Sequence, residues 1–174
     1  TSPSFTANRI LGVILFEQTM DRSIEGIPTT DYLWEKKGIV SFLKVDKGLA
    51  DLANGVQLMK PNPGLEDLLK RGVDRRVFGT KMRSVIQEAN PEGVRNIVAQ
   101  QFQVGRVILD AGLMPIIEPE VDIHSPSKAE AEKLLKVEIL NHLEQLEDDH
   151  QIILKLTIPD QDGFYTDLVN HTRV

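Results

Sequence analysis

Short, almost continuous apolar runs recur along the chain at nearly regular intervals. Five of them are predicted to be buried strands: 9–16, 38–45, 76–83, 113–121 and 151–158. Their starts lie 29, 38, 37 and 38 residues apart, which leaves room for a helix between successive strands. Runs without a polar face are typical of parallel strands that are covered on both sides. The pattern therefore predicts parallel strands connected by helices.

Segments with helical periodicity and recognisable helix ends fill the gaps. Helices are predicted at 29–38, 62–72, 90–112, 127–146 and 163–171, and a turn at 54–56. Pro63 is expected just inside the start of the second helix, while Asn90 and Gly112 are expected to cap the two ends of the third. Ser127 and Glu130 have the spacing of a capping box at the start of the fourth. Strands that alternate with helices predict an α/β fold.

Two α/β architectures fit this order, an open doubly wound sheet and a closed barrel. Neither G-x-G-x-x-G nor G-x-x-x-x-G-K-[ST] follows any strand, which disfavours an open nucleotide-binding sheet. Charged residues within the strands favour a (β/α)8 barrel, whose interior can be polar near the C-terminal ends of the strands. Five units in 174 residues scale to roughly 280 residues for eight. We therefore expect one domain, residues 1–174, that forms part of a barrel truncated at both ends.

Composition and charge exclude several kinds of site. The chain has no cysteine, which rules out disulfides and thiolate metal sites and fits a reducing cytosol. Its net charge of −6 disfavours nucleic-acid binding. Neither a membrane span nor a signal peptide is predicted. His124, His142, His150 and His171 show no ligand spacing, so we expect surface or loop histidines and no metal site.

One lysine interrupts the last apolar run, QIILKLTI at 151–158. The even-numbered residues from 152 to 158 form a wholly apolar face that suits an outer layer of helices. Lys155 lies on the alternate face and is therefore predicted to point into the barrel. Burying an unpaired ammonium group costs several kcal/mol, roughly, so its position requires a chemical explanation.

The same alternation places charged residues on the inner faces of three further strands. In each strand the apolar positions come first and the charges follow at the C-terminal end, where the active sites of barrels lie. These residues are Lys44, Asp46, Lys81, Arg83, Glu118 and Glu120. On one strand such charges usually form a structural ion pair. Because four strands agree in both face and end, we predict a functional site at this mouth.

The residue types at this mouth point to imine chemistry. A lysine enclosed by apolar residues and by the cations Lys81 and Arg83 is expected to have a lowered pKa and a free amine. Such an amine attacks a ketone or aldehyde to form a Schiff base. Glu118 or Glu120 could carry the protons that this reaction exchanges, and the spare cations suit a phosphorylated substrate. The residues alone leave the identity of that substrate open.

Several motifs resemble those of class I fructose-bisphosphate aldolases, in particular the shorter bacterial type. They are KVDKG at 44–48, K-x-R at 81–83, EPE at 118–120 and ILKLTIP at 153–159, and the resemblance extends over nearly the whole chain. It implies a (β/α)8 TIM barrel of which this chain supplies about strands 2–6. It also implies a cytoplasmic lyase of glycolysis and gluconeogenesis that needs no metal. That lyase reversibly cleaves fructose 1,6-bisphosphate into dihydroxyacetone phosphate and glyceraldehyde 3-phosphate.

The resemblance also implies roles for individual residues. Lys155 matches the Schiff-base lysine, and Glu118 matches the carboxylate that serves the proton transfers of imine formation and hydrolysis. Glu120 matches a second carboxylate, which hydrogen-bonds to neighbouring lysines. Lys81 and Arg83 match the cationic pair that positions substrate hydroxyls and a phosphate. Lys155, Glu118, Glu120 and Lys81 are thus the expected catalytic residues.

Lys44 matches the lysine of KVDKG that lines the pocket, and Lys44, Asp46 and Arg83 are the expected substrate-binding residues. Three functional parts of the family have no counterpart here. The strand that carries a first aspartate would precede Thr1, and a phosphate-binding SGG loop and arginine would follow Val174. Two alternatives therefore stay open: another lysine-dependent sugar-phosphate lyase, and a catalytically inert piece that acts only in binding or as a scaffold. The oligomeric state is also open, and a homo-oligomer is retained as one alternative.

Overall fold

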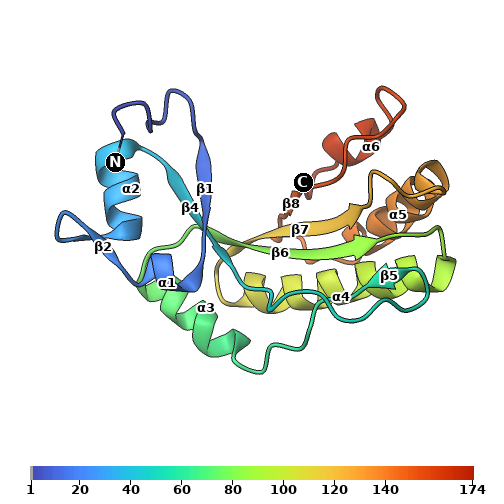
Figure 1. The fold of residues 1–174 in the computed structure, drawn as a ribbon, viewed down its shortest axis with the longest axis horizontal. Coiled ribbons are helices and arrows are strands. Elements are labelled where there is room, and N and C mark those ends of the chain that lie inside the picture. Colours follow the sequence, from blue (N-terminus) through green and yellow to red (C-terminus); the bar gives the residue numbers. More distant parts are fainter. Residues whose placement is uncertain (1) are drawn as a thin grey trace.

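The computed structural model describes residues 2–174 as a twisted parallel sheet flanked by helices (Figure 1). The strand order is β1-β4-β6-β7-β8, and every neighbouring pair in this order is parallel. These strands are Gly12–Leu15, Val40–Lys44, Gly79–Ile86, Met114–Val121 and Ile153–Leu154. The order follows the chain without the reversal of a doubly wound sheet. The expected α/β fold, part of a TIM barrel wall, is therefore confirmed.

Three short strands lie outside this parallel series. The strand β5 (Val56–Gln57) pairs antiparallel with the last residues of β6, and Asn54 and Gly55 form the predicted turn before it with positive φ angles of 49° and 71°. The strands β2 (Ser23–Ile24) and β3 (Ile27–Pro28) form a separate hairpin. The hydrophobic pattern predicts none of these strands, because each is only two residues long.

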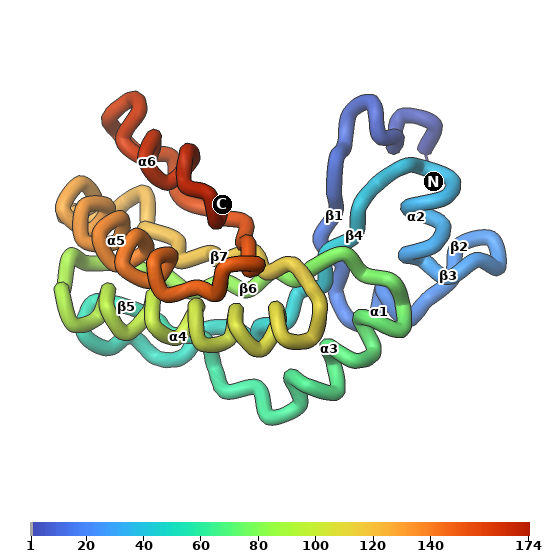
Figure 2. Tube along the Cα trace, turned by 180° about the vertical axis from the view of Figure 1, so that it is seen from behind, coloured from blue at the N-terminus to red at the C-terminus, as the bar shows by residue number. Residues whose placement is uncertain are grey.

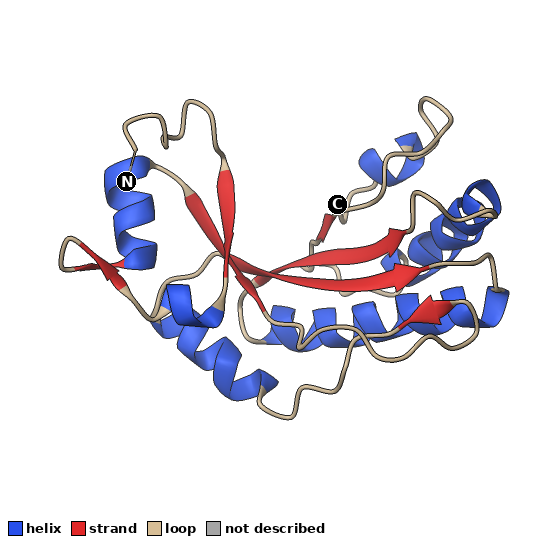
Figure 3. Cartoon of the chain, viewed as in Figure 1, coloured by secondary structure: helices blue, strands red, loops and turns tan. Residues whose placement is uncertain are grey.

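Six helices are present among residues 2–174: α1 (Glu17–Met20), α2 (Thr29–Lys37), α3 (Leu65–Asp74), α4 (Pro91–Asp110), α5 (Lys128–Leu143) and α6 (Thr166–Val169). The helix α4 packs along both β6 and β7, and α5 lies beside it, as the view from behind shows (Figure 2). In Figure 3 the helices α3 and α4 run beneath the sheet. The strands thus have a helix-covered face and an opposite, inner face.

The expected helix ends are confirmed for α4 and corrected for α3. The side chain of Asn90 accepts a hydrogen bond from the backbone of the first turn of α4, and Gly112 follows the end of that helix with a φ of 80°. Pro63, by contrast, lies before α3, which begins at Leu65. Gly64 takes the N-cap position between them, so the proline stiffens the approach to the helix and not its first turn.

The predicted capping box at the start of α5 is wrong. Ser127 is the N-cap residue, but its side chain does not bond to the first turn of the helix. Its Oγ accepts a hydrogen bond from the backbone nitrogen of Ala89 at 2.8 Å instead. The hydroxyl therefore ties the start of α5 to the segment that follows β6, a contact between residues far apart in sequence.

The main core fills the space between the sheet and its helices. Leu43, Met82 and Ile117 project from three neighbouring strands into this layer and are fully buried. Each such side chain contributes about 1.5–3 kcal/mol of hydrophobic stabilisation. Because side chains alternate along a strand, the residue next to each of them must face the opposite side. Packing under the helices therefore turns Lys44, Lys81 and Glu118 toward the barrel interior.

The excursion between β4 and α3 is fastened to α4 by a close approach of two backbones. Gly93, in the first turn of α4, lies against the carbonyl oxygen of Asn54, and a Cβ atom at Gly93 would overlap that oxygen. The turn around Asn54 can therefore reach the helix only because position 93 has no side chain.

We predict that Gly93→Ala destabilises the full-length protein by about 1–3 kcal/mol, because the backbone of the excursion must move to admit the methyl group. Chemical denaturation would measure the loss. Gly64→Ala is the matched control, since the nearest atom to a Cβ there is the side-chain oxygen of Asn62 at 3.8 Å. Equal unfolding midpoints for the two variants would contradict this explanation.

Candidate active site

The charged residues of neighbouring strands meet because the strands are in register. Lys44 of β4 pairs with Lys81 of β6, and Arg83 of β6 pairs with Glu118 of β7. Since successive side chains alternate, these charges lie on the inner face. Lys44 ends β4, as predicted, but β6 extends from Gly79 to Ile86, so Lys81 and Arg83 lie in its first part and middle and not at the predicted C-terminal end. The structure therefore brings together the residues that the sequence pattern groups.

Glu118 is the centre of this group. Its side chain is only 3% exposed, yet one oxygen lies 2.6 Å from Nζ of Lys155 and the other 2.9 Å from Nζ of Lys81. Lys81 is itself buried. A buried carboxylate is costly unless it is paired, and two ammonium groups offset that cost here. Glu118 thus accepts a hydrogen bond from Lys155, along which a proton can pass, whereas its contact with Lys81 is an ion pair without hydrogen-bond geometry.

Lys155 points toward Glu118, but its predicted burial is wrong for this chain. Its side chain is 53% exposed. The reason is that β8 ends at Leu154. Beyond it the backbone makes one hydrogen bond to β7, from the nitrogen of Lys155 to the carbonyl of Ile117, and the hydroxyl of Thr157 adds one to the carbonyl of Val121. The last predicted strand, 151–158, is therefore shorter than expected. The amine lies beside the charged cluster and is not enclosed by apolar residues.

Arg83 and Glu120 form a separate pair at the rim of the cluster. The guanidinium donates through Nε and one terminal nitrogen to the two carboxylate oxygens of Glu120, at 2.9 and 2.6 Å. This pairing lowers the pKa of Glu120 and raises that of Arg83. The expected hydrogen bonds from lysines to Glu120 are therefore replaced by bonds from Arg83, while Lys155 and Lys81 act on Glu120 only through their charge.

Asp46 organises the backbone at the mouth. Its Oδ1 accepts from Nζ of Lys44 at 2.6 Å and from the nitrogen of Gly48 at 3.1 Å, and its Oδ2 accepts from the nitrogen of Arg83 at 3.3 Å. Its side chain is only 4% exposed. The carboxylate thus joins the KVDKG turn to β6 and orients Lys44. Its contacts favour a positioning role over direct substrate binding.

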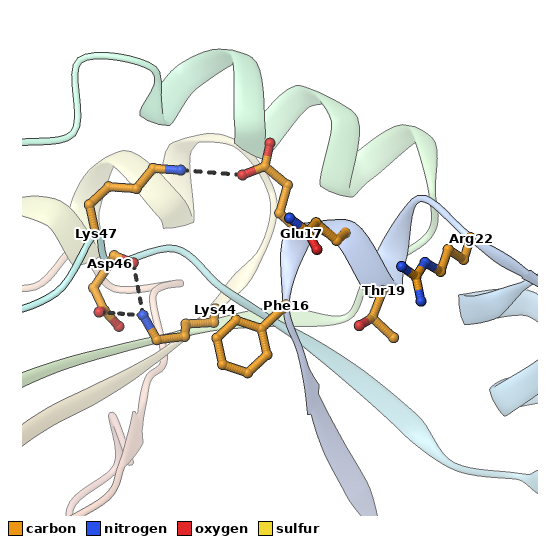
Figure 4. Close-up of a pocket in the computed structure, with 8 residues that line it drawn as sticks. Phe16, Glu17, Thr19, Arg22, Lys44, Asp46 and Lys47 are labelled. Carbon is orange, nitrogen blue, oxygen red and sulfur yellow. Dashed lines mark hydrogen bonds and ion pairs between the residues drawn. The ribbon is translucent and has the colours of Figure 1, made fainter.

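A hollow of about 450 Å³ lies beside Lys44 and Asp46 (Figure 4). Its wall includes residues that the sequence reasoning did not select: Phe16, Glu17, Gln18, Thr19, Arg22 and Lys47. The ammonium of Lys44 lies over the ring of Phe16, 5.8 Å from its centroid, and Lys47 pairs with Glu17 at 3.2 Å. Most of these residues come from the short helix α1 and its flanks, where no periodic pattern marked a site.

The histidines do not converge on the cluster. His142 departs from its expected surface or loop position, because its ring stacks on Phe102 with the centroids 4.9 Å apart and burial lowers its pKa. His150 lies with Glu147 and Asp149 in the only group among residues 2–174 whose side chains could together hold a metal ion. That group lies in the connection before β8, at the opposite end of the strands from the mouth. Its two carboxylates are exposed, and it takes no part in the site.

Comparison with known proteins identifies the family. The sequence profile described as fructose-bisphosphate aldolase class-I matches residues 1–160. The class 1 fructose-bisphosphate aldolase of Porphyromonas gingivalis is 58% identical over 171 residues, which cover 98% of this chain. That of Synechocystis sp. is 55% identical over all 174 residues. The chain belongs to the class I fructose-bisphosphate aldolase family.

The chain spans 58% of the length of each of these two relatives. A solved structure of fructose-bisphosphate aldolase from Plasmodium falciparum, in complex with TRAP and a small-molecule inhibitor, is similar in fold with a TM-score of 0.63. The similarity covers 76% of this chain and 42% of that one at 22% sequence identity, so it supports the barrel fold alone. Among residues 2–174, no helix is both long and apolar enough to cross a membrane.

We predict that Arg83→Leu raises the pKa of Glu120, because it removes the hydrogen bonds that stabilise the ionised carboxylate. The native pair stabilises the fold above the unfolded pKa of Glu120, and this contribution is lost as the pH falls through the lowered folded value. Titration of the labelled glutamate carboxyl carbons by NMR would measure the shift. Arg95→Leu, which removes a guanidinium 3.8 Å from Glu138, is the control. An unchanged Glu120 pKa in Arg83→Leu would contradict the assignment.

Proposed function

We propose that the protein is a Schiff-base aldolase of the cytoplasm. It reversibly cleaves fructose 1,6-bisphosphate into dihydroxyacetone phosphate and glyceraldehyde 3-phosphate in glycolysis and gluconeogenesis. The observation that carries the proposal is the position of Glu118 between Lys81 and Lys155, within 2.9 Å of both amines. An amine beside a carboxylate that can exchange protons with it is the arrangement that imine formation requires.

The proposed chemistry begins at the amine of Lys155. After passing a proton to Glu118, the neutral amine attacks the substrate ketone and forms a carbinolamine. Glu118 returns the proton to the carbinolamine hydroxyl, which leaves as water, and a cationic iminium remains. The iminium at C2 accepts the electron pair of the C3–C4 bond while the C4 hydroxyl gives its proton to the Glu118 carboxylate, so that the aldehyde product leaves and an enamine remains. That proton is then available for the enamine carbon. Protonation of the enamine and hydrolysis of the iminium release the second product and restore Lys155.

The remaining cations supply recognition of an anionic substrate. Lys81 and Lys44 lie in register on neighbouring strands, and Arg83 follows Lys81 on the same face. Positive groups at a shared mouth attract and orient phosphates. Because the iminium nitrogen is itself the electron sink, this mechanism uses a covalent lysine imine and no metal. Glu120 holds the guanidinium of Arg83 in place, and Asp46 does the same for Lys44.

We predict that Glu118→Gln lowers the rate of fructose 1,6-bisphosphate cleavage by the full-length protein by about 10²–10⁴-fold, because an amide cannot shuttle the proton. Steady-state kinetics would measure the loss. Glu130→Gln is the control, since that side chain is 59% exposed and pairs only with Lys133 at 3.4 Å. A glutamine variant as active as the control would remove Glu118 from the mechanism.

A panel of phosphorylated keto sugars distinguishes the proposal from its two alternatives. We predict that the full-length protein cleaves fructose 1,6-bisphosphate with the highest kcat/KM. A clear preference for a different keto sugar phosphate would establish another lysine-dependent lyase. If no sugar phosphate is cleaved but the protein binds them, an inert binding or scaffold role would replace the aldolase proposal.

A further inference from the structure

Helix α4 places a buried polar side chain against β7, the strand that carries Glu118. Gln101 is fully buried, and its Oε1 accepts from the backbone nitrogen of Glu118 at 3.2 Å. Its Nε2 donates to the carbonyl of Glu118 at 3.3 Å and to Oγ of Ser84 on β6 at 2.8 Å. The side-chain amide therefore contacts both backbone polar atoms of one residue, Glu118.

Packing alone does not explain a glutamine at this position. The neighbouring side chains on the same face of α4, Ile97, Val98 and Phe102, are apolar and buried against the sheet. Burying an amide costs free energy unless its hydrogen bonds are made. All the hydrogen bonds that Gln101 makes go to Glu118 and Ser84. The side-chain amide of Gln101 is thus matched to the backbone of β7 at Glu118.

We propose that Gln101 is a positioning residue for Glu118. By holding the backbone of Glu118 against α4, it fixes the position from which the carboxylate contacts both Lys81 and Lys155. The two contacts, 2.9 and 2.6 Å long, leave little freedom for the strand to shift. This inference rests on the proposed function, in which Glu118 carries the protons of imine formation. Gln101 itself bonds to Ser84 and to the backbone of Glu118, and to neither amine.

Gln100 provides a matched control one position earlier on the same helix. Its side chain also makes two hydrogen bonds to the backbone of a single residue. It accepts from the nitrogen of Met59 at 2.8 Å and donates to the carbonyl of Met59 at 3.0 Å. That contact fastens the excursion before α3 and does not involve Glu118. Replacing either glutamine removes a similar set of hydrogen bonds, but only one replacement releases Glu118.

The test compares Gln101→Leu and Gln100→Leu in the full-length protein. Rapid mixing with dihydroxyacetone phosphate, followed by borohydride, measures the rate of imine formation at Lys155. We expect Gln101→Leu to slow this step by about ten- to a hundredfold with little change in substrate binding, because a misplaced proton carrier acts on the rate. Gln100→Leu is expected to form the imine at the wild-type rate. Equal rates in the two variants would overturn the proposal.

Gln101→Glu supplies a second readout that remains informative if Gln101→Leu does not fold. A neutral carboxyl group at position 101 can still accept from the nitrogen of Glu118 and donate to its carbonyl or to Ser84. Its ionised form cannot donate and repels the Glu118 carboxylate. Burial favours the neutral form, so imine formation should be nearly normal at low pH and fall as the pH rises. A pH profile that parallels the wild type would contradict the positioning role.

Failure of this inference differs from failure of the proposed function. If the wild-type protein forms no adduct at Lys155, the aldolase mechanism fails and with it the role of Gln101. If the wild type forms the adduct and neither Gln101 variant changes its rate or pH dependence, only the positioning role is overturned.

Discussion

The carboxylate of Glu118, held between the ammonium groups of Lys81 and Lys155, is the interaction on which the rest of the site depends. A carboxylate that is almost fully buried persists only because both of its oxygens have a cationic partner. The same arrangement places a carboxylate beside the amine of Lys155, as the proposed proton transfer requires, and fixes a second cation next to it. Stability and the proposed chemistry therefore impose the same geometry on β6, β7 and the segment after β8.

Alternation along the strands is what made this cluster predictable. Leu43, Met82 and Ile117 must be buried under the helices, so the residues beside them must face the interior, and parallel strands bring those residues to one level. The alternation of strands with helices and the residues at both ends of α4 followed from the same kind of local pattern. For this reason the inner face could be assigned from the sequence.

The parts that escaped prediction depend on contacts between distant residues. The exposure of Lys155 follows from the short pairing of β8, and neither can be inferred from an apolar run. Ser127 bonds to Ala89 and Gln101 bonds to Glu118, across 38 and 17 residues respectively. Such contacts between a side chain and a distant backbone produce no periodic pattern of apolar and polar residues in the sequence. The hollow beside α1 was missed for the same reason.

Borohydride trapping tests the central claim most directly. The full-length protein would be incubated with dihydroxyacetone phosphate, reduced, digested and examined by peptide mass spectrometry. Because Lys155 has the Glu118 carboxylate 2.6 Å from its amine, the proposed mechanism predicts one dominant reduced adduct, on the peptide that contains Lys155. An adduct confined to Lys81 or Lys44, or no adduct at all, would contradict it.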